Sequence, residues 1–294
     1  MWYSDAYHMP DPEISIIIVS WNVRDLLIAC LRSLAQYVST PHEVIVVDNH
    51  SADGTIEVLR RDFPQVTIIA NNHNAGFARA NNQGWQKARG RYVCFLNPDT
   101  ECIDNPFPTL IDYLRLHPHV GIVGPRLLNP NRSHQLSVRR FPKFLDQALV
   151  LLKVRWLGRW VPPLRKYQYN TEANSAEPVT VDQVMGACIV MPRTVLADAG
   201  SFDEGYWIWF EEVDLCRRLK TKGYATVYVP AAQLVHHGGQ SFAQHVSVMK
   251  QLWLMKSLGR YANTYWSAPA RIGIYALMPI SYLLTFVQSL FKPK

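Results

Sequence analysis

Short runs of β-branched residues recur through the first half of the chain, each followed by a stretch with helical spacing or by a turn. Strands separated by helices of this length form a parallel sheet whose two faces are both covered. The sequence therefore predicts an α/β fold with a mainly parallel sheet flanked by helices. The five predicted strands are ISIIIVS (14–20), EVIVVDN (43–49), VTIIA (66–70), RYVCFLN (91–97) and VGIVGP (120–125).

The size and composition predict a folded, enzyme-sized protein. A chain of 294 residues with 48% hydrophobic residues can bury a large core. Its five scattered cysteines include no C-x-x-C pair, so neither a disulfide framework nor a zinc knuckle is indicated. The start, MWYSDAYHMPDPE, has acids and prolines where a secretory signal has a basic start and an apolar run. We therefore expect the active part to be cytosolic.

Polar side chains collect where the predicted strands end. In doubly wound sheets, ligands bind outside the carboxyl ends of the strands. No G-x-G-x-x-G follows the first strand and no G-x-x-x-x-G-K-[ST] is present, so neither a dinucleotide fold nor a P-loop is supported. The residues at the strand ends are Ser20, Asn22, Asp48, Asn49, the run 71–74, Asn97 and Asp99.

Asp99 stands at the tip of a predicted buried strand, directly after Pro98. A carboxylate in such a turn is a good ligand for Mg²⁺ or Mn²⁺, which use substrate phosphates to complete their shells. Alternatively, Asp99 only caps the next helix, although Asp104 before Asn105 and Pro106 is the better helix start. The residue by itself leaves both interpretations open.

Six motifs occur in order: VSWN (19–22), VDNHSADGT (47–55), NNHNAGFARANNQG (71–84), LNPDT (96–100), FDEGYWIWFEEVDLCRRLKTKGY (202–224) and HHGGQS (236–241). Together they resemble the family 2 glycosyltransferases, most closely the rhamnosyltransferase-like branch, over roughly residues 13–245. The resemblance implies a GT-A fold with a Rossmann-like sheet and a nucleotide-sugar donor. It also implies a divalent metal, Mg²⁺ or Mn²⁺, and inversion at the anomeric carbon.

The resemblance also assigns the donor and metal residues. LNPDT stands where the family keeps its D-x-D type metal motif, with Asn97 at the first acidic position as a nucleotide contact. Asp99 is then a metal ligand, and His236 a second one, although the His236 and His237 pair can equally face a phosphate or form a plain turn. Asp53 is assigned to helix capping. The residues assigned to the nucleotide or donor are Ser20, Asn22, Asp48, Asn74, Gly76, Asn81, Asn97 and Asp99.

Glu212 is the candidate catalytic base. It shares a helical stripe with Leu215, Cys216 and Leu219, and a carboxylate that heads an apolar stripe is costly to bury without a role. The resemblance places the base at this position, where an Asp is commoner. Asp214 is expected to pair with Arg218 in a structural role. Alternatively, Glu211 and Glu212 only decorate a helix start.

The net charge of +7 is concentrated between residues 126 and 166, where ten Lys or Arg stand against Asp146 alone. Aromatic and apolar residues interrupt this segment over 139–160, which suits a helix lying on an anionic membrane, and no nucleic-acid-binding signature accompanies the charge.

The uncharged run 272–291 is long enough to span a bilayer. Because it contains Pro279 and a polar stripe, we prefer an in-plane or docked helix. We expect peripheral or C-terminally anchored attachment at the cytoplasmic face of the plasma membrane.

The domain organisation follows: an N-terminal tail (1–12), a glycosyltransferase domain (13–245) and a helical, membrane-associated segment (246–294). The nucleotide-sugar half is expected over 13–125 and the acceptor half over 126–245. The predicted reaction moves a sugar, with rhamnose as the nearest resemblance, from a nucleoside diphosphate to a hydroxyl of a glycan or polyprenyl-linked acceptor of a cell-surface polysaccharide. The alternatives are a sugar nucleotidyltransferase, which lacks its glycine-rich loop here, and a non-catalytic nucleotide-sugar binder. The sequence makes no prediction of oligomeric state.

Overall fold

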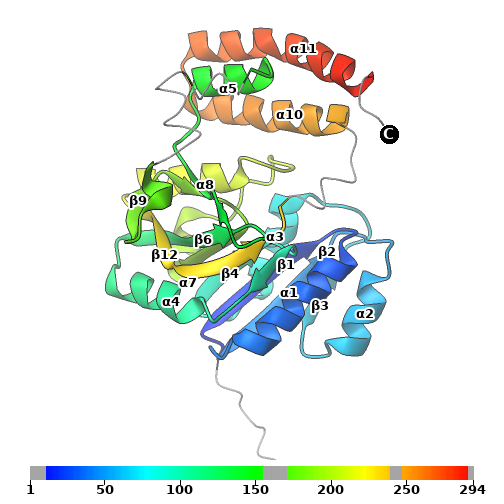
Figure 1. Ribbon diagram of the computed structural model, residues 1–294, viewed down its shortest axis with the longest axis vertical. Helices are drawn as coiled ribbons and strands as arrows, with labels where there is room; N and C mark the ends of the chain where they lie inside the picture. The colour runs from blue at the N-terminus through cyan, green and yellow to red at the C-terminus, as the bar shows by residue number, and fades with distance from the viewer. Residues whose placement is uncertain (1–10, 155–159, 161–170, 239–246, 291–294) are drawn as a thin grey trace, which may run out of the picture.

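A mixed sheet of ten strands forms the centre of the protein in a computed structural model that describes residues 11–154, 160, 171–238 and 247–290. The strand order is β3-β2-β1-β4-β11-β6-β12-β5, with β7 paired to β6 and β9 to β12 (Figure 1). A separate pair joins β8 to β10. The strands are β1 Ile14–Ser20, β2 His42–Asp48, β3 Thr67–Ala70, β4 Tyr92–Leu96, β5 Thr100–Cys102, β6 Val120–Leu128, β7 His134–Gln135, β8 Val138–Arg139, β9 Val179–Val181, β10 Gln183–Val184, β11 Cys188–Pro192 and β12 Ala225–His236.

All five predicted strands are present, and the predicted α/β class is confirmed. Strands β3, β2, β1 and β4 run parallel, as the alternation with helices requires. The antiparallel strand β11, which comes from the second half of the chain, then separates β4 from β6. Strand β6 crosses the expected division at 125–126, so both halves share one sheet.

Helices cover both faces of the sheet because the strand side chains alternate between them. Ile14, Ile16 and Ile18 of β1 pack with α1, α2 and α4 in one core. Ile17 and Phe95 pack in a second core with side chains of α3, α7 and α8. These helices are α1 Arg24–Tyr37, α2 Thr55–Asp62, α3 Phe77–Lys87, α4 Phe107–Leu116, α7 Arg193–Ala199 and α8 Glu211–Thr221.

Three further helices form a layer beyond α8: α5 Phe144–Leu151, α10 Ser247–Tyr265 and α11 Ala268–Leu290. Figure 1 shows this helical layer at the top of the molecule, above the sheet. A third apolar core joins the layer to α8 through Leu151, Val213, Leu258 and Ile274. The C-terminal helices are therefore docked on the α/β unit.

Parts of the predicted segments lie outside the described residues. They are residues 1–10 of the N-terminal tail, 155–159 of the basic aromatic segment, 239–241 of the last motif and residue 291 of the apolar run.

Candidate active site

A cavity of about 970 Å³ lies at the carboxyl ends of β1, β2 and β4 and extends to the helical layer. This is the edge at which an α/β sheet places its ligands. Its walls come from segments far apart in the sequence. Representative lining residues are Val19, Trp21, Asn49, Asn74 and Gly76 at one end, Asn97, Asp99, Gln135, Arg139, Gly186, Glu211, Glu212 and His236 in the middle, and Gln147, Val150, Trp253 and Leu254 at the helical layer.

Asp99 and His236 meet in the middle of the cavity, as predicted from their positions in the motifs. Strand β12 ends at His236 beside β5, with His236 opposite Thr100. The His236 Nε2 atom lies 3.3 Å from Asp99 Oδ1, and each side chain is only 7% exposed. The backbone N–H of His237 donates to the Asp99 carbonyl at 2.8 Å, which holds the two segments in register.

The hydrogen bonds of Gln135 define which ring nitrogen of His236 carries the proton. The Gln135 amide nitrogen lies 3.0 Å from Asn129 Oδ1 and 3.2 Å from the His236 carbonyl, so it donates to both. Gln135 Oε1 must then accept from His236 Nδ1–H at 2.7 Å. In the neutral ring the lone pair is then on His236 Nε2, which is buried and has no hydrogen-bond partner among the described residues.

This arrangement fits a divalent cation. An imidazole lone pair facing a buried carboxylate oxygen, with the other ring nitrogen donating to an amide, is the orientation that metal-binding histidines adopt. The described residues include no group of three or more His, Cys, Asp or Glu side chains that could hold a metal. Asp99 and His236 therefore offer two ligands, which suits Mg²⁺ or Mn²⁺ because these ions complete their shells with substrate phosphates and water.

His237 lies outside this pair. Its Nε2 atom is 2.6 Å from Glu101 Oε1, and that carboxylate is 38% exposed. Neither His237 nor Glu101 lines the cavity. The structure thus places His236, and not its neighbour, beside Asp99.

Glu211 and Glu212 both reach the cavity at the start of α8. Each has an Oε2 atom that is buried without a hydrogen-bond partner among the described residues. Burial raises the pKa of both carboxyls, and for Glu211 the nearby charge of Glu212 adds to the rise. Helix N–H groups and the positive charge of Arg139 oppose the rise in the pKa of Glu212. Arg139 therefore favours ionisation of Glu212 over Glu211.

The backbone ahead of α8 is what turns both acids inward. Trp209 and Phe210 have left-handed φ values of 61° and 71°, which are uncommon for aromatic residues. Such strain persists where the surroundings hold the backbone in place. Here Ser257 Oγ of α10 donates to the Ile208 carbonyl at 2.7 Å.

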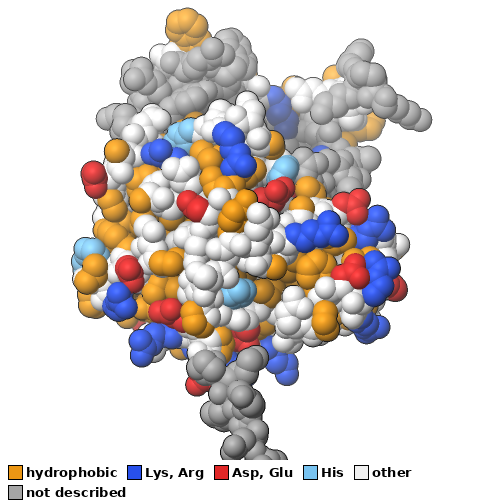
Figure 2. Space-filling model, turned by 60° about the horizontal axis from the view of Figure 1, so that its bottom comes forward, with side chains coloured by type: hydrophobic (Ala, Val, Ile, Leu, Met, Phe, Trp, Pro, Cys, Tyr) orange, Lys and Arg blue, Asp and Glu red, His pale blue; other side chains and the backbone are white. Residues whose placement is uncertain are grey.

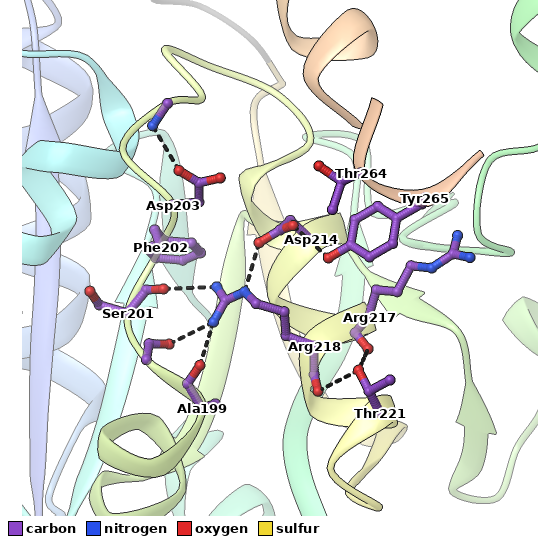
Figure 3. Close-up of polar contacts among 12 residues, drawn as sticks. Ala199, Ser201, Phe202, Asp203, Asp214, Arg217, Arg218, Thr221, Thr264 and Tyr265 are labelled. Carbon is purple, nitrogen blue, oxygen red and sulfur yellow. Dashed lines mark hydrogen bonds and ion pairs between the residues drawn. The ribbon is translucent and has the colours of Figure 1, made fainter. Parts of the chain in front are cut away.

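A buried polar network fixes the position of α8 (Figure 3). Arg218 Nε donates to Asp214 Oδ2 at 2.7 Å, which confirms the predicted structural pair. The same guanidinium also donates to the Gly200 and Ser201 carbonyls at 3.0 and 2.8 Å. Tyr265 of α10 donates from its hydroxyl to the other Asp214 oxygen at 2.7 Å. The helix that carries the two glutamates is thus tied to both the α/β unit and the helical layer.

Four predicted donor residues line the cavity, namely Asn74, Gly76, Asn97 and Asp99. The other four do not line it. Asp48 accepts from the Ser51 N–H at 2.9 Å, Asn22 from the Ala52 N–H at 2.7 Å, and Asn81 donates to the Phe77 carbonyl at 3.0 Å. Ser20 Oγ and Asp48 Oδ1 are buried without a partner among the described residues.

Gly76 is needed for packing against protein as well as for access to the cavity. Its φ is 84°, and a Cβ atom there would lie 2.9 Å from the Trp207 ring and 3.0 Å from the Trp207 carbonyl. That carbonyl accepts from the Phe77 N–H at 3.0 Å. The glycine therefore lets the segment before α8 lie directly against the start of α3.

The sequence did not indicate several lining residues. Trp21 stands between two predicted residues, and Asn49 was noted at a strand end but not assigned to the donor; only the sheet edge shows which neighbour faces inward. Arg139 was visible only as one member of a basic segment. Trp207 and Trp253 come together, with ring centroids 6.5 Å apart, because α10 packs beside the segment before α8.

Comparison with known proteins agrees with this geometry. A family model, "Glycosyl transferase family 2", matches residues 15–198. The chain is 26% identical, over 88% of each chain, to an N-acetylglucosaminyl-diphospho-decaprenol L-rhamnosyltransferase of Mycobacterium tuberculosis. It is also 26% identical to rhamnosyltransferase WbbL of Escherichia coli K12, over 84% of this chain and 92% of the other.

Two solved structures share the fold. Mannosyltransferase PcManGT from Pyrobaculum calidifontis, in complex with GDP-Man and Mn²⁺, matches with a TM-score of 0.58 and 18% identity over 95% of this chain and 74% of that one. GalNAc-T7 with UDP, GalNAc and Mn²⁺ matches with a TM-score of 0.58 and 16% identity, over 78% of this chain and 44% of that one. The likeness supports the predicted GT-A type fold.

Proposed function

The chain belongs to glycosyl transferase family 2, and from this premise we propose that it is a metal-dependent, inverting rhamnosyltransferase acting on a polyprenyl diphosphate-linked acceptor. The observation that carries the proposal is the single cavity in which buried, unpartnered carboxylate oxygens lie together with the Asp99 and His236 pair. The similarity to two rhamnosyltransferases supports the choice of sugar. One of these relatives acts on N-acetylglucosaminyl-diphospho-decaprenol, which supports the choice of acceptor.

The donor would occupy the end of the cavity lined by Trp21, Asn49 and Asn74, with its diphosphate toward Asp99 and His236. These two side chains would hold Mg²⁺ or Mn²⁺, as the Mn²⁺ in both structural neighbours supports. The metal would supply positive charge against the charge that develops on the leaving diphosphate. The Gln135 amide keeps the His236 Nε2 lone pair available for this role.

Glu212 would act as the general base toward the acceptor hydroxyl. Burial raises the pKa of its carboxyl, which brings the base closer to the operating pH and strengthens it as a proton acceptor. Glu211 would keep its proton, because two adjacent buried carboxyls do not ionise together easily. Attack by the hydroxyl on the face opposite the leaving diphosphate inverts the anomeric carbon.

Helix α11 supports membrane attachment in the plane of the bilayer. It is long and apolar enough to cross a membrane, and only 17% of its most apolar stretch is buried inside the protein. Its Ser281 and Thr285 are buried, and Gln251 of α10 donates to Ser281 Oγ at 2.9 Å. Ser281 and Thr285 of the predicted polar stripe thus face protein, whereas Gln288 at its end is exposed. The opposite stripe is apolar and exposed, and consists of Ile272, Tyr275, Leu283, Phe286 and Leu290.

The orientation of this apolar stripe favours a helix that lies on the membrane. Helix α10 is fixed to the α/β unit by the Arg260–Asp203 ion pair at 2.7 Å, and α11 packs along α10. The opposite end of the molecule differs, because there acidic and basic side chains are interspersed with apolar ones (Figure 2). A basic segment beside an apolar stripe suits an anionic leaflet, so we place the protein at the cytoplasmic face of the plasma membrane.

A transfer assay tests the proposed function. The protein is incubated with a panel of nucleoside diphosphate sugars and N-acetylglucosaminyl-diphospho-prenol, with Mn²⁺ or with a chelator. We expect transfer of one sugar, rhamnose, only when the metal is present. Transfer of another sugar would show that the donor sugar is not rhamnose. Full activity in the presence of chelator would contradict the proposed metal dependence. Donor binding without any transfer would favour the non-catalytic alternative.

A further inference from the structure

Arg139 is the only Lys or Arg among the described residues that line the cavity. Its side chain makes no hydrogen bond or ion pair with another described residue that would neutralise it. The next residue, Arg140, differs, because it lies 3.5 Å from Glu172 and lines a separate surface pocket. An unpaired guanidinium at the wall of a ligand cavity is suited to bind an anion.

The backbone that carries Arg139 is well supported. Strand β8 pairs with β10, and Arg139 stands opposite Gln183. The buried Gln183 amide donates to the Arg140 carbonyl at 2.7 Å, and the Phe141 N–H donates to Asp182 Oδ2 at 3.1 Å. The guanidinium is thus presented from a fixed base, while the side chain itself stays exposed to the cavity.

Arg139 is close in sequence to the part of the cavity wall that the helical layer forms. The chain passes in three residues from Arg139 to Pro142 and then enters α5, whose Gln147 and Val150 line the same cavity. Trp253 and Leu254 of α10 continue this apolar wall. On its other side Arg139 is near enough to Glu212 for its charge to lower that carboxyl's pKa.

The cavity therefore combines a carboxylate, a cation and an apolar wall, and this wall belongs to the helical layer that also carries the exposed apolar stripe. A lipid-linked acceptor has one group for each of these features: a sugar hydroxyl, a diphosphate, and a prenyl chain that continues into the bilayer. We propose that Arg139 binds the diphosphate of the lipid-linked acceptor, with the first prenyl units against Val150 and Leu254. This inference rests on the proposed function, because it names the acceptor group that the same site recognises.

The first test measures binding and needs no sugar transfer. Geranyl diphosphate is titrated into the full chain and into Arg139→Gln, with geraniol as the uncharged probe and Arg140→Gln as the matched charge control. We expect Arg139→Gln to weaken geranyl diphosphate binding by about 10- to 100-fold, with Arg139→Lys between it and the wild type. Arg139→Gln should change the affinity for geraniol by less than about twofold, and Arg140→Gln should change the affinity for geranyl diphosphate by less than about twofold. Equal binding of geranyl diphosphate by wild type and Arg139→Gln overturns the proposal, as does an equal loss in Arg140→Gln.

The second test separates the acceptor diphosphate from that of the donor. Arg139→Gln should leave the Kd of the nucleoside diphosphate with Mn²⁺ unchanged, whereas loss of nucleoside diphosphate binding would assign Arg139 to the donor and overturn the proposal. In turnover, kcat/KM should fall about 10- to 100-fold for N-acetylglucosaminyl-diphospho-prenol and stay near wild type for a neutral alkyl glycoside of the same sugar. An equal fall for both acceptors would mean that Arg139 acts only on Glu212, which also overturns it. If the wild type transfers no sugar, the proposed function fails, and the binding test still decides the diphosphate site.

Discussion

At the scale of single residues, the site depends on atoms that are buried without a hydrogen-bond partner among the described residues. The Oε2 atoms of Glu211 and Glu212 and the Nε2 atom of His236 are all in this state, and all three residues line one cavity. A buried polar atom without a hydrogen bond destabilises the folded protein, so several in one place indicate that a ligand completes the site. Three substitutions separate the roles of these residues.

Replacing Glu212 by Gln should remove the base while keeping the shape of the side chain. We expect kcat to fall about 10²- to 10⁴-fold, with donor and metal binding retained. Because the base must be ionised, wild-type activity should rise with pH through the raised pKa of Glu212. This acidic limb should disappear in Glu212→Gln. If Glu211→Gln is the inactive variant and Glu212→Gln turns over normally, the base is misassigned.

Replacing Glu211 by Gln should stabilise the protein at neutral pH. The pKa of buried Glu211 lies well above that of the unfolded chain, so the folded state binds its proton more tightly. Wild-type stability therefore falls as pH rises from about 4.5, the usual Glu value, through the raised pKa. The Tm of Glu211→Gln should exceed that of the wild type by a few degrees at pH 8 and match it near pH 4. A constant difference in Tm at all pH values would contradict this assignment.

Replacing Asp99 by Asn should abolish the Mn²⁺-dependent part of donor binding, since a neutral amide is a weaker ligand for a hard cation. Glu101→Gln is the matched control, because Glu101 is close in sequence but pairs with His237 outside the cavity. Thermal-shift titration of the donor with and without Mn²⁺ measures the effect. Undiminished stabilisation by the donor with Mn²⁺ in Asp99→Asn would remove Asp99 from the metal site.

At the scale of elements, the segment before α8 connects the two ends of the cavity. It packs on α3 through Trp207 and Gly76, and on α10 through Ser257 and Ile208. The left-handed residues Trp209 and Phe210 then set the direction in which α8 begins. The proposed donor end and the two glutamates of α8 are therefore connected by one continuous stretch of chain.

Replacing Gly76 by Ala tests this connection. Its φ of 84° and ψ of 167° are open essentially only to glycine, and the new Cβ would meet the Trp207 backbone. We expect a loss of about 2–4 kcal/mol in the free energy of unfolding, together with weaker donor binding. Gly223→Ala is the control, because its φ is 88° but nothing lies within 4 Å. If Gly76→Ala and Gly223→Ala lower the free energy of unfolding in urea equally, the contact with Trp207 contributes nothing to the loss.

At the scale of the whole molecule, the helical layer serves both the cavity and the outer surface. Trp253 and Leu254 of α10 and Val150 of α5 form one wall of the cavity. The outward side of α11 exposes apolar side chains, with Ile272 at 71%, Leu283 at 61% and Leu290 at 66%. An apolar stripe of this kind marks an interaction surface. On the proposed function, the lipid chain of the acceptor would stay in the bilayer while its sugar enters the cavity.

Replacing both Leu283 and Phe286 by Glu should release the protein from membranes without unfolding it, since both side chains are exposed. Each substitution should lower the partition into phosphatidylglycerol vesicles by at least about tenfold, measured by co-sedimentation. Leu116→Glu is the control, because Leu116 is 72% exposed at the end of α4. High salt should weaken wild-type binding through the basic segment. Unchanged sedimentation of the double variant would exclude α11 as the membrane surface.

The sequence by itself determined the parallel strands, the edge at which the cavity lies and the family. Runs of β-branched residues and polar strand ends are local signals, and the motifs are read directly from the chain. Asp99, Asn97, Asn74, Gly76, Glu212 and His236 were all predicted site residues that line the cavity.

Only the tertiary structure decided the insertion of β11 between β4 and β6, the burial of Ser281 and Thr285 in α11, and which of the predicted donor residues line the cavity. These features depend on contacts between segments far apart in the chain. A residue's propensity does not encode which neighbour will pack against it. The same reason hid Arg139, whose role depends on strand β10, helix α8 and helix α5 meeting around it.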